Sequence, residues 1–196
     1  IAGSGTHTPE AARIAAEEDF GYPMFIKPAR QGSSFGAGVA KTREDFDRTL
    51  RAAIKAGDGR VLIEKYIDNR VELECAYLGA CGKQLFTPIG EITCRGFYDY
   101  DTKYKEDSEA KVTPDSSYDA GFGDTLCEWS SLLVEHLGIR HLARLDFFLS
   151  GERLYFNEIN TFPGFTESSL YPRLVAKLGI SPGEQFELFI SDAISV

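Results

Sequence analysis

Two short apolar runs separated by a tight turn constrain this chain more than any other segment, because charged and amide side chains interrupt them. Residues 144–149 read Arg-Leu-Asp-Phe-Phe-Leu, and residues 154–160 read Leu-Tyr-Phe-Asn-Glu-Ile-Asn. Residues 150–153, Ser-Gly-Glu-Arg, form the turn between them. Aliphatic and aromatic runs bounded in this way predict two strands of a hairpin.

The polar side chains of this hairpin are expected to share one face. Alternate residues of a strand point the same way, so Arg144 and Asp146 share a face, as do Glu158 and Asn160. With the turn centred on Glu152, Asp146 lies opposite Glu158 and Arg144 opposite Asn160. Facing carboxylates repel each other. A divalent cation removes that repulsion, and oxygen-only ligands of this kind suit Mg²⁺.

A surface hairpin whose polar face meets water is the alternative interpretation. It weakens if apolar side chains share the face with the acids, because the polar groups then lie in a half-buried cleft. The same alternation predicts Phe148, Leu154 and Phe156 on the acidic face.

Size and composition narrow the classes of protein. The chain has 196 residues, enough for one large domain or two small ones, and 43% of them are hydrophobic. Its net charge of −9 disfavours a general nucleic-acid binder. It shows no apolar run of membrane-spanning length, and no signal peptide is visible in it. The first residue is Ile, so we expect a fragment or a processed product. The four cysteines lack zinc-finger spacing and predict free thiols in a reducing cytosol.

Helix signals occur at four places along the chain. Thr8-Pro9 predicts a helix to about Asp19, and Thr42 caps a second, with Phe46, Leu50, Ala53 and Ile54 on one stripe. A third is expected over residues 124–137, with inward residues Leu126, Trp129, Leu133 and Leu137. Ser181 caps the last, with inward residues Phe186, Phe189, Ile190 and Ala193.

Strands are expected at residues 24–27 and 61–66, and again between residues 72 and 93. Residues 97–121 are polar and predict a long loop of the kind that forms lids. The sum is an α+β fold. A smaller βαβ-like unit fills residues 1–71 and a larger mixed unit fills residues 72–196. The cleft between two such units is a common ligand site.

Two weaker motifs are consistent with nucleotide binding. Lys27 ends a strand before a glycine- and serine-rich loop at residues 30–38, whose amides can hold phosphate; a flexible hairpin turn explains the loop equally well. The strand end from Glu64 to Ile67 can offer backbone groups to adenine, and Glu72 can accept from a ribose hydroxyl. A solvated strand end is the simpler alternative.

Two further motifs are consistent with substrate binding. In residues 163–170, Gly164 allows close backbone approach, and Ser168 or Ser169 near a helix N-terminus favours a carboxylate. Plain N-capping by serine explains the same pattern. Residues 98–104 are aromatic and charged, and a lid there could bring Lys103 to a phosphate. A mobile surface loop is the alternative.

The order and spacing of these motifs resemble the ATP-grasp superfamily and, within it, the D-alanine–D-alanine ligases. The matching segments cover nearly the whole chain and are residues 25–34, 61–66, 97–104, 143–146 and 157–166. The resemblance implies two α+β subdomains with a nucleotide site between them. It also implies a missing N-terminal domain and a missing upstream lysine, so that this chain is an incomplete ligase.

The resemblance assigns roles residue by residue. It implies that ATP phosphates contact Lys27, Lys65, Ser33 and Ser34, and that the remaining nucleotide contacts are Glu64, Ile67, Glu72, Phe148 and Asn157. It implies two Mg²⁺ or Mn²⁺ ions on Asp146, Glu158 and Asn160. It implies oxyanion stabilisation by Arg144 and the Gly164 amide, and binding of the second substrate's carboxylate by Ser169 and the Leu170 amide. Ser33, Lys103 and Tyr104 complete the catalytic set, the last two in the lid.

The activity implied is ATP-dependent joining of two D-alanines through a D-alanyl phosphate, for peptidoglycan synthesis in the cytoplasm. The Lys103-Tyr104 pair is similar to that of dipeptide-forming members. D-Ala–D-Ser ligation, another ATP-grasp carboxylate–amine ligase and a catalytically silent nucleotide-binding module stay open as alternatives. The partners implied are D-alanine and ATP, with no nucleic acid and no membrane. A homodimer of the full-length protein is left open.

Overall fold

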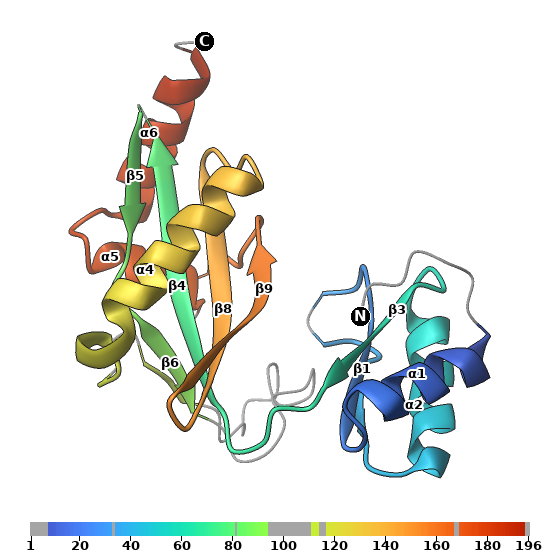
Figure 1. Cartoon of the computed structure of the whole chain (residues 1–196). Coiled ribbons are helices and arrows are strands. Elements are labelled where there is room, and N and C mark those ends of the chain that lie inside the picture. The colour runs from blue at the N-terminus through green and yellow to red at the C-terminus, as the bar shows by residue number, and fades with distance from the viewer. Residues whose placement is uncertain are drawn as a thin grey trace. The chain divides into compact units, whose positions relative to one another are not determined.

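The computed structural model describes residues 8–32, 34–80, 82–93, 111–113, 117–166 and 169–194. These residues form two compact units, which meet in the sequence at Asp68 and Asn69. Each unit has its own sheet and its own hydrophobic core, and each is described by itself (Figure 1).

The first unit is a three-stranded antiparallel sheet with two helices. Its elements are α1 (Pro9–Asp19), β1 (Met24–Pro28), β2 (Gly38–Ala40), α2 (Arg43–Ala56) and β3 (Val61–Lys65). The strand order is β2-β1-β3, and β1 is antiparallel to both neighbours. The helices and the sheet enclose a core made of Ala16, Met24, Ile26, Ala40, Phe46, Leu50 and Ala53.

The expected βαβ-like unit is wrong in one respect, because it lacked strand β2. The first residue of β2, Gly38, is the last residue of the loop predicted at residues 30–38. The glycine-rich loop turns the chain back, so that β2 pairs with β1 as a hairpin. Helix α2 does join two strands of the same direction, β2 and β3, but β1 lies between them. The arrangement is therefore a split βαβ unit, and the loop is the connection of a hairpin.

Local signals set the helix starts of this unit correctly. The Thr8 hydroxyl accepts a hydrogen bond from the Ala11 amide, and the Thr42 hydroxyl accepts one from the Asp45 amide, both at 3.2 Å. The predicted stripe on α2 is correct except for Ile54, which is 40% exposed. At about 100° per residue, Ile54 lies about 80° from Phe46 around the helix, at the edge of the stripe.

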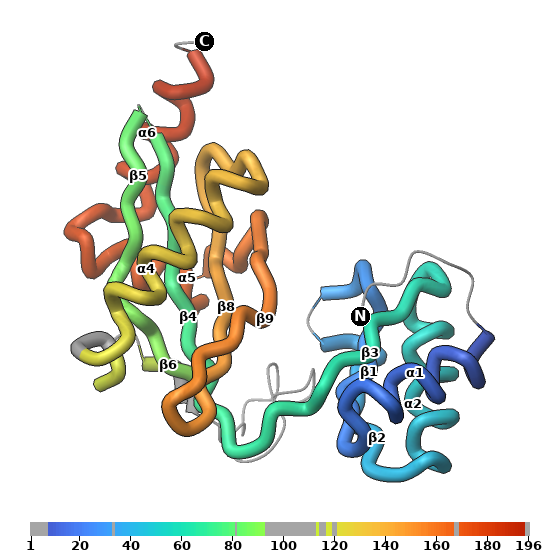
Figure 2. Tube along the Cα trace, in the orientation of Figure 1, coloured from blue at the N-terminus to red at the C-terminus, as the bar shows by residue number. Residues whose placement is uncertain are grey.

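The second unit is built on a larger antiparallel sheet. Its elements are β4 (Val71–Ala80), β5 (Lys83–Phe86), β6 (Gly90–Thr93), β7 (Lys111–Thr113), α4 (Asp119–His136), β8 (Leu142–Ser150), β9 (Arg153–Asn160), α5 (Leu170–Ala176) and α6 (Pro182–Ile194). The strand order is β7-β6-β4-β8-β9, and β5 also pairs with β4. Figure 2 shows the chain leaving β8 through a tight turn and returning as β9.

The two faces of this sheet have different covers. Helix α4 crosses one face, whereas α5 and α6 lie on the other (Figure 1). The core lies under α4 and consists of Leu73, Tyr77, Ile89, Leu126, Val134, Ala143, Leu145, Phe147 and Leu149. Among the described residues, no helix is long and apolar enough to cross a membrane.

Three expectations about this unit differ from the structure. Residues 97–121, expected as one loop, include β7 and the first residues of α4, which begins at Asp119 and not at residue 124. Leu137 follows the end of α4 and is 57% exposed. The capping box at Ser181 is confirmed by reciprocal hydrogen bonds with Glu184.

The inward face of α6 was assigned correctly at Phe189 and wrongly at the other three positions. Phe186 and Ile190 are 52% and 57% exposed, and Ala193 is exposed. The residues that face the unit follow another stripe of the same helical period, made of Gln185, Leu188, Phe189 and Asp192. Gln185 is fully buried, so a polar residue occupies an inward position that a prediction from apolar residues alone does not select.

Candidate functional site

The polar face of the β8–β9 hairpin has the register that the sequence predicts. Asp146 lies opposite Glu158, and Arg144 lies opposite Asn160. Glu158 is exposed, whereas Asp146 is only 9% exposed. Two carboxylates therefore face each other from neighbouring strands, one near solvent and one buried.

The reason given for this register was wrong. The turn is centred between Gly151 and Glu152, because Ser150 pairs with Arg153. A ladder continued from that turn would place Asp146 opposite Asn157. The register shifts between Asp146 and Phe147, where Asn157 is an extra residue on β9. This β-bulge restores the pairing of Asp146 with Glu158.

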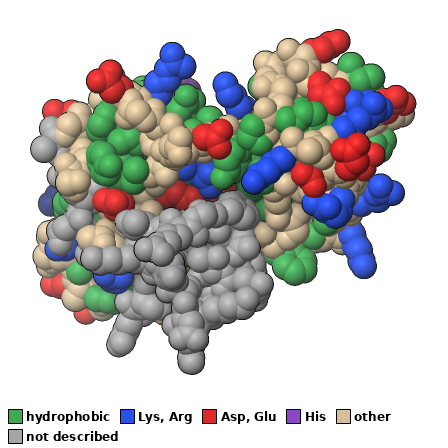
Figure 3. All heavy atoms as spheres, turned by 90° about the horizontal axis from the view of Figure 1, so that it is seen from below, with side chains coloured by type: hydrophobic (Ala, Val, Ile, Leu, Met, Phe, Trp, Pro, Cys, Tyr) green, Lys and Arg blue, Asp and Glu red, His purple; other side chains and the backbone are tan. Residues whose placement is uncertain are grey.

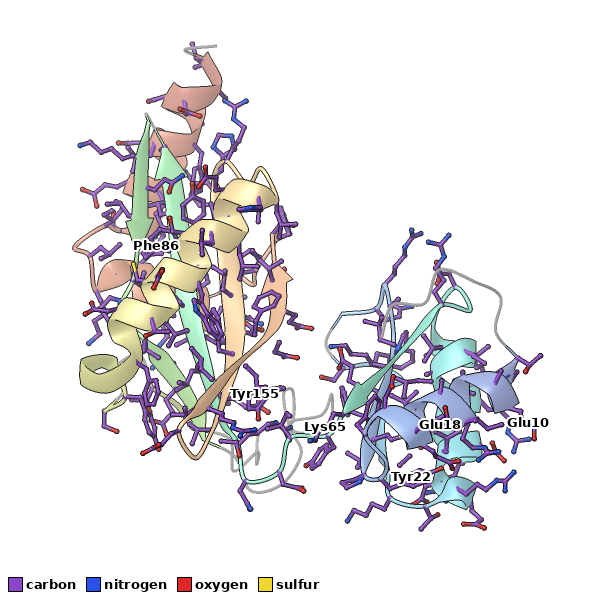
Figure 4. All side chains as sticks on the ribbon, in the orientation of Figure 1. Glu10, Glu18, Tyr22, Lys65, Phe86 and Tyr155 are labelled. Carbon is purple, nitrogen blue, oxygen red and sulfur yellow. The ribbon has the colours of Figure 1, made fainter. Side chains whose placement is uncertain are left out.

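The bulge also changes which apolar side chains accompany the acids. Phe156 pairs with Phe147 of the core, and their ring centroids lie 5.8 Å apart. Leu154 packs against the same core. Both were predicted on the acidic face and lie on the α4 face instead, because one extra residue reverses the alternation of a strand. Tyr155, labelled on β9 in Figure 4, takes the place next to Phe148.

Arg144 is held by two carboxylates on this face. Its Nε and Nη2 donate to the two oxygens of Asp146, each at 2.7 Å. Its Nε also lies 3.1 Å from Oε2 of Glu74. Burial alone would lower the pKa of Arg144, but the hydrogen bonds to Asp146 and the charges of the nearby carboxylates outweigh burial and raise that pKa. The guanidinium is therefore a fixed positive charge.

Strand β4 contributes Glu74, which the sequence analysis did not select, beside Glu72, which it did; Arg70, also not selected, directly precedes the strand. Glu74 lies opposite Asp146 and Glu72 lies opposite Phe148. Arg70 contacts Glu72 at 3.1 Å, and its guanidinium lies 4.7 Å from the centre of the Phe148 ring. The signal for Glu74 was present: two acids at alternate positions of an apolar strand, Glu72 and Glu74, share a face.

The donor set on the hairpin fits a hard divalent cation. Two carboxylates and an amide oxygen are ligands that Mg²⁺ accepts, and facing carboxylates are stabilised by a cation between them. Within the described residues, no group of three or more His, Cys, Asp or Glu side chains could hold a metal. The candidate site therefore depends on Asp146 and Glu158 together with Asn160, whose Oδ1 accepts a hydrogen bond from the Phe162 amide at 3.1 Å.

The segment before α5 brings Gly164 close to Ser169. A Cβ at Gly164 would lie 2.7 Å from the Ser169 hydroxyl, so any larger residue there would force that hydroxyl to move. Ser169 is the N-cap of α5, and its hydroxyl contacts the Thr166 hydroxyl at 2.8 Å. Leu170 is the first helical residue. The predicted position of Ser169 beside a helix N-terminus is confirmed.

The residues predicted to contact the phosphates of the nucleotide belong to the first unit. Nζ of Lys27 on β1 lies 3.1 Å from Oε2 of Glu64 on β3. Lys65 ends β3 and is exposed (Figure 4). Ser34 lies in the β1–β2 loop with a left-handed φ of 57°. Ser33, Lys103 and Tyr104 fall outside the residues that the structure describes.

On the face drawn in Figure 3, the acidic and basic side chains of the described residues are interspersed. Cys75 is a free, buried thiol and Cys127 a free, exposed one; Cys81 and Cys94 lie outside the described ranges.

Comparison with known proteins places these features in one family. Residues 3–191 match the family described as D-ala D-ala ligase C-terminus. The chain is 38% identical over 180 residues to D-alanine–D-alanine ligase of Treponema pallidum, covering 90% of this chain and 44% of that protein. It is 40% identical over 167 residues to the ligase of Ruminiclostridium cellulolyticum, covering 83% and 44%.

A solved structure agrees with the sequence relatives. VanG D-Ala:D-Ser ligase from Enterococcus faecalis superposes with a TM-score of 0.80 at 32% identity, covering 93% of this chain and 52% of that one. The chain thus spans about half the length of the proteins that it matches. The predicted α+β, ATP-grasp fold is confirmed. With a match over nearly all of its residues, the chain belongs to the D-alanine–D-alanine ligase family and corresponds to the C-terminal part of its members.

Proposed function

We propose that the complete gene product joins two D-alanines with ATP, through a D-alanyl phosphate, and that this chain carries the catalytic face. One observation carries the proposal: Arg144 is fixed beside a facing pair of carboxylates on a single sheet face, in a chain of the ligase family. The product, D-Ala-D-Ala, is a building block for peptidoglycan, and the need for ATP assigns the reaction to the cytoplasm.

The chemistry requires activation of the first carboxylate. A carboxylate resists attack by an amine, because hydroxide is a poor leaving group, and phosphorylation by ATP supplies a better one. Two Mg²⁺ ions held by Asp146, Glu158 and Asn160 would offset negative charge on the transferring phosphoryl group. Lys27 and Lys65 would hold ATP phosphates as point charges, with Ser33 and Ser34 beside them.

The other nucleotide contacts are proposed on both units. Glu64 and Ile67 at the end of β3 would receive the adenosine, together with Glu72, Phe148 and Asn157. The Arg70 guanidinium already lies over one face of the Phe148 ring. That contact would fix the ring's orientation for a nucleotide.

The second step is attack by the amine of another D-alanine on the acyl phosphate. The carbonyl oxygen becomes an oxyanion, which the Arg144 guanidinium and the Gly164 amide would stabilise. The Ser169 hydroxyl and the Leu170 amide would bind the carboxylate of the attacking D-alanine. Lys103 and Tyr104 would close the lid over both substrates, and the held geometry would contribute to the rate.

Phosphate release tests the proposal. The complete gene product is incubated with ATP and Mg²⁺ and with D-Ala, D-Ser, D-lactate or L-Ala, alone and in pairs with D-Ala. Phosphate release that requires D-Ala, with D-Ala-D-Ala identified by mass spectrometry, is the expected result. ATP binding without substrate-dependent phosphate release would favour a silent nucleotide-binding module.

A D-Ala–D-Ser ligase is the second candidate, because VanG, at 32% identity, is named a D-Ala:D-Ser ligase. The mixed incubation separates the two: a D-Ala-D-Ser product in excess over D-Ala-D-Ala would select it. Sedimentation of the same preparation measures whether the complete protein is a homodimer.

A further inference from the structure

Glu74 is a buried acid that none of the roles above uses. It lies in the middle of β4 and is 4% exposed. In the sheet it is paired on one side with Asp146 of β8 and on the other with Gly90 of β6. A Cβ at Gly90 would lie 3.0 Å from side-chain atoms of Leu170 and Leu174, so α5 closes over this part of the face. Glu74 is thus shielded from water at the centre of the candidate site.

Glu74 contacts the guanidinium that Asp146 also contacts. Its Oε2 lies 3.1 Å from Nε of Arg144, and the same Nε donates to Asp146 at 2.7 Å. Both oxygens of Asp146 are engaged by Arg144. A cation at Asp146 must therefore compete with Arg144 for those oxygens.

Counting charges shows why a second acid is needed. Asp146 and Glu158 together carry two negative charges, and the proposed Mg²⁺ ions would engage both. If Asp146 is committed to the metal, the positive charge of Arg144 needs another partner in a site that α5 shields. Glu74 is the acid already within 3.1 Å of it.

We infer that Glu74 is a positioning residue: it holds the Arg144 guanidinium in place and balances its positive charge while Asp146 binds the metal ion. The inference rests on the proposed function, because it assumes that Asp146 is a metal ligand and that Arg144 serves the oxyanion. The alternative is a purely structural ion pair. Buried ion pairs contribute little net stability compared with apolar residues of similar size, so a structural role alone gives no reason for the pair.

The test removes the charge of Glu74 and keeps its shape. Glu74→Gln is made in the complete gene product, with Glu152→Gln at the exposed hairpin turn as the matched control. Binding of Mn²⁺, a spectroscopic substitute for Mg²⁺, is followed by electron paramagnetic resonance in the presence of ADP. We expect Mn²⁺ affinity to fall about 10-fold to 100-fold in Glu74→Gln, the usual cost of losing an outer-shell partner, and to stay unchanged in the control.

The dependence of phosphate release on Mg²⁺ gives a second readout. In Glu74→Gln the Mg²⁺ concentration for half-maximal rate should rise, and saturating Mg²⁺ should restore part of the rate. Glu74→Asp keeps the negative charge, so its Mg²⁺ concentration for half-maximal rate should lie between those of the wild type and Glu74→Gln. Unchanged Mn²⁺ affinity in a folded Glu74→Gln protein would overturn the inference. Unfolding of both Glu74→Gln and Glu74→Asp would also overturn it, because Glu74 would then serve stability.

Failure of the proposed function would look different. If the wild-type gene product released no phosphate with any amino acid, the ligase activity would be wrong. The Mn²⁺ affinities of wild type, Glu74→Gln and Glu152→Gln would still decide whether Glu74 supports the metal site.

Discussion

Replacing Arg144 by Met should destabilise the second unit strongly. The substitution keeps most of the side-chain volume but removes the positive charge between Glu74 and Asp146. The side chains of these two acids are only 6% and 12% exposed, so neither can regain full hydration. Breaking a buried ion pair by deleting one partner costs about 3–5 kcal/mol. Because the Arg144 side chain itself is 20% exposed, we expect the lower end, about 3 kcal/mol.

The measurement is urea unfolding followed by the fluorescence of Trp129, the one tryptophan of the chain, which packs against the core of the same unit. For a protein of this size, a loss of about 3 kcal/mol corresponds to a lower Tm by about 6–12 °C. The variant Arg144→Met with Glu74→Gln and Asp146→Asn should recover at least about 1 kcal/mol, because no buried charge is then unpaired. A loss below about 1 kcal/mol in Arg144→Met would refute the reasoning, since exposed ion pairs behave that way.

Three other predictions test the site, the bulge and the first unit. Glu158→Ala in the complete gene product should abolish phosphate release while leaving the unfolding curve almost unchanged, because Glu158 is exposed; a wild-type rate would refute the metal assignment. Phe156→Ala should cost about 1–2 kcal/mol in urea unfolding, less than the full burial value, because the ring is 39% exposed but contacts the core; no loss would argue against the bulge. Hydrogen bonds from Arg13 and Tyr22 hold the pKa of Glu17 below its ordinary value of 4.5. The stability that Glu17 contributes is therefore present above that value and lost as pH falls below it. In Glu17→Gln, Tm should therefore change less between about pH 3 and pH 5 than in the wild type. An unchanged dependence of Tm on pH would contradict this.

Local signals in the sequence were sufficient wherever a few neighbouring residues decide the structure. The hydroxyls of Thr8, Thr42 and Ser181 bind amides within three residues, and all three caps are confirmed. Gly151 has a left-handed φ of 60° and forms the predicted turn between β8 and β9. The family resemblance was also visible in the sequence, because it rests on short segments whose order can be read directly.

The sequence also identified the facing acids, but through an incorrect register. Asp146 does lie opposite Glu158, because a bulge at Asn157 compensates for a turn displaced from Glu152. A bulge inserts one residue without a distinctive composition, so alternation alone placed Phe156 on the wrong face. The face of α6 was misassigned for a related reason: several stripes of a helix can be apolar, and packing chooses between them.

Strand order is what only the tertiary structure decided. Glu74 and Arg144 are 70 residues apart in the chain and meet because β4 lies beside β8 in the sheet. Nothing local to either residue encodes that pairing, which follows from how the whole unit buries its apolar faces. The sequence by itself determined the types of side chain available for the chemistry. The sheet determined that the half-buried guanidinium of Arg144 has two carboxylates rather than one.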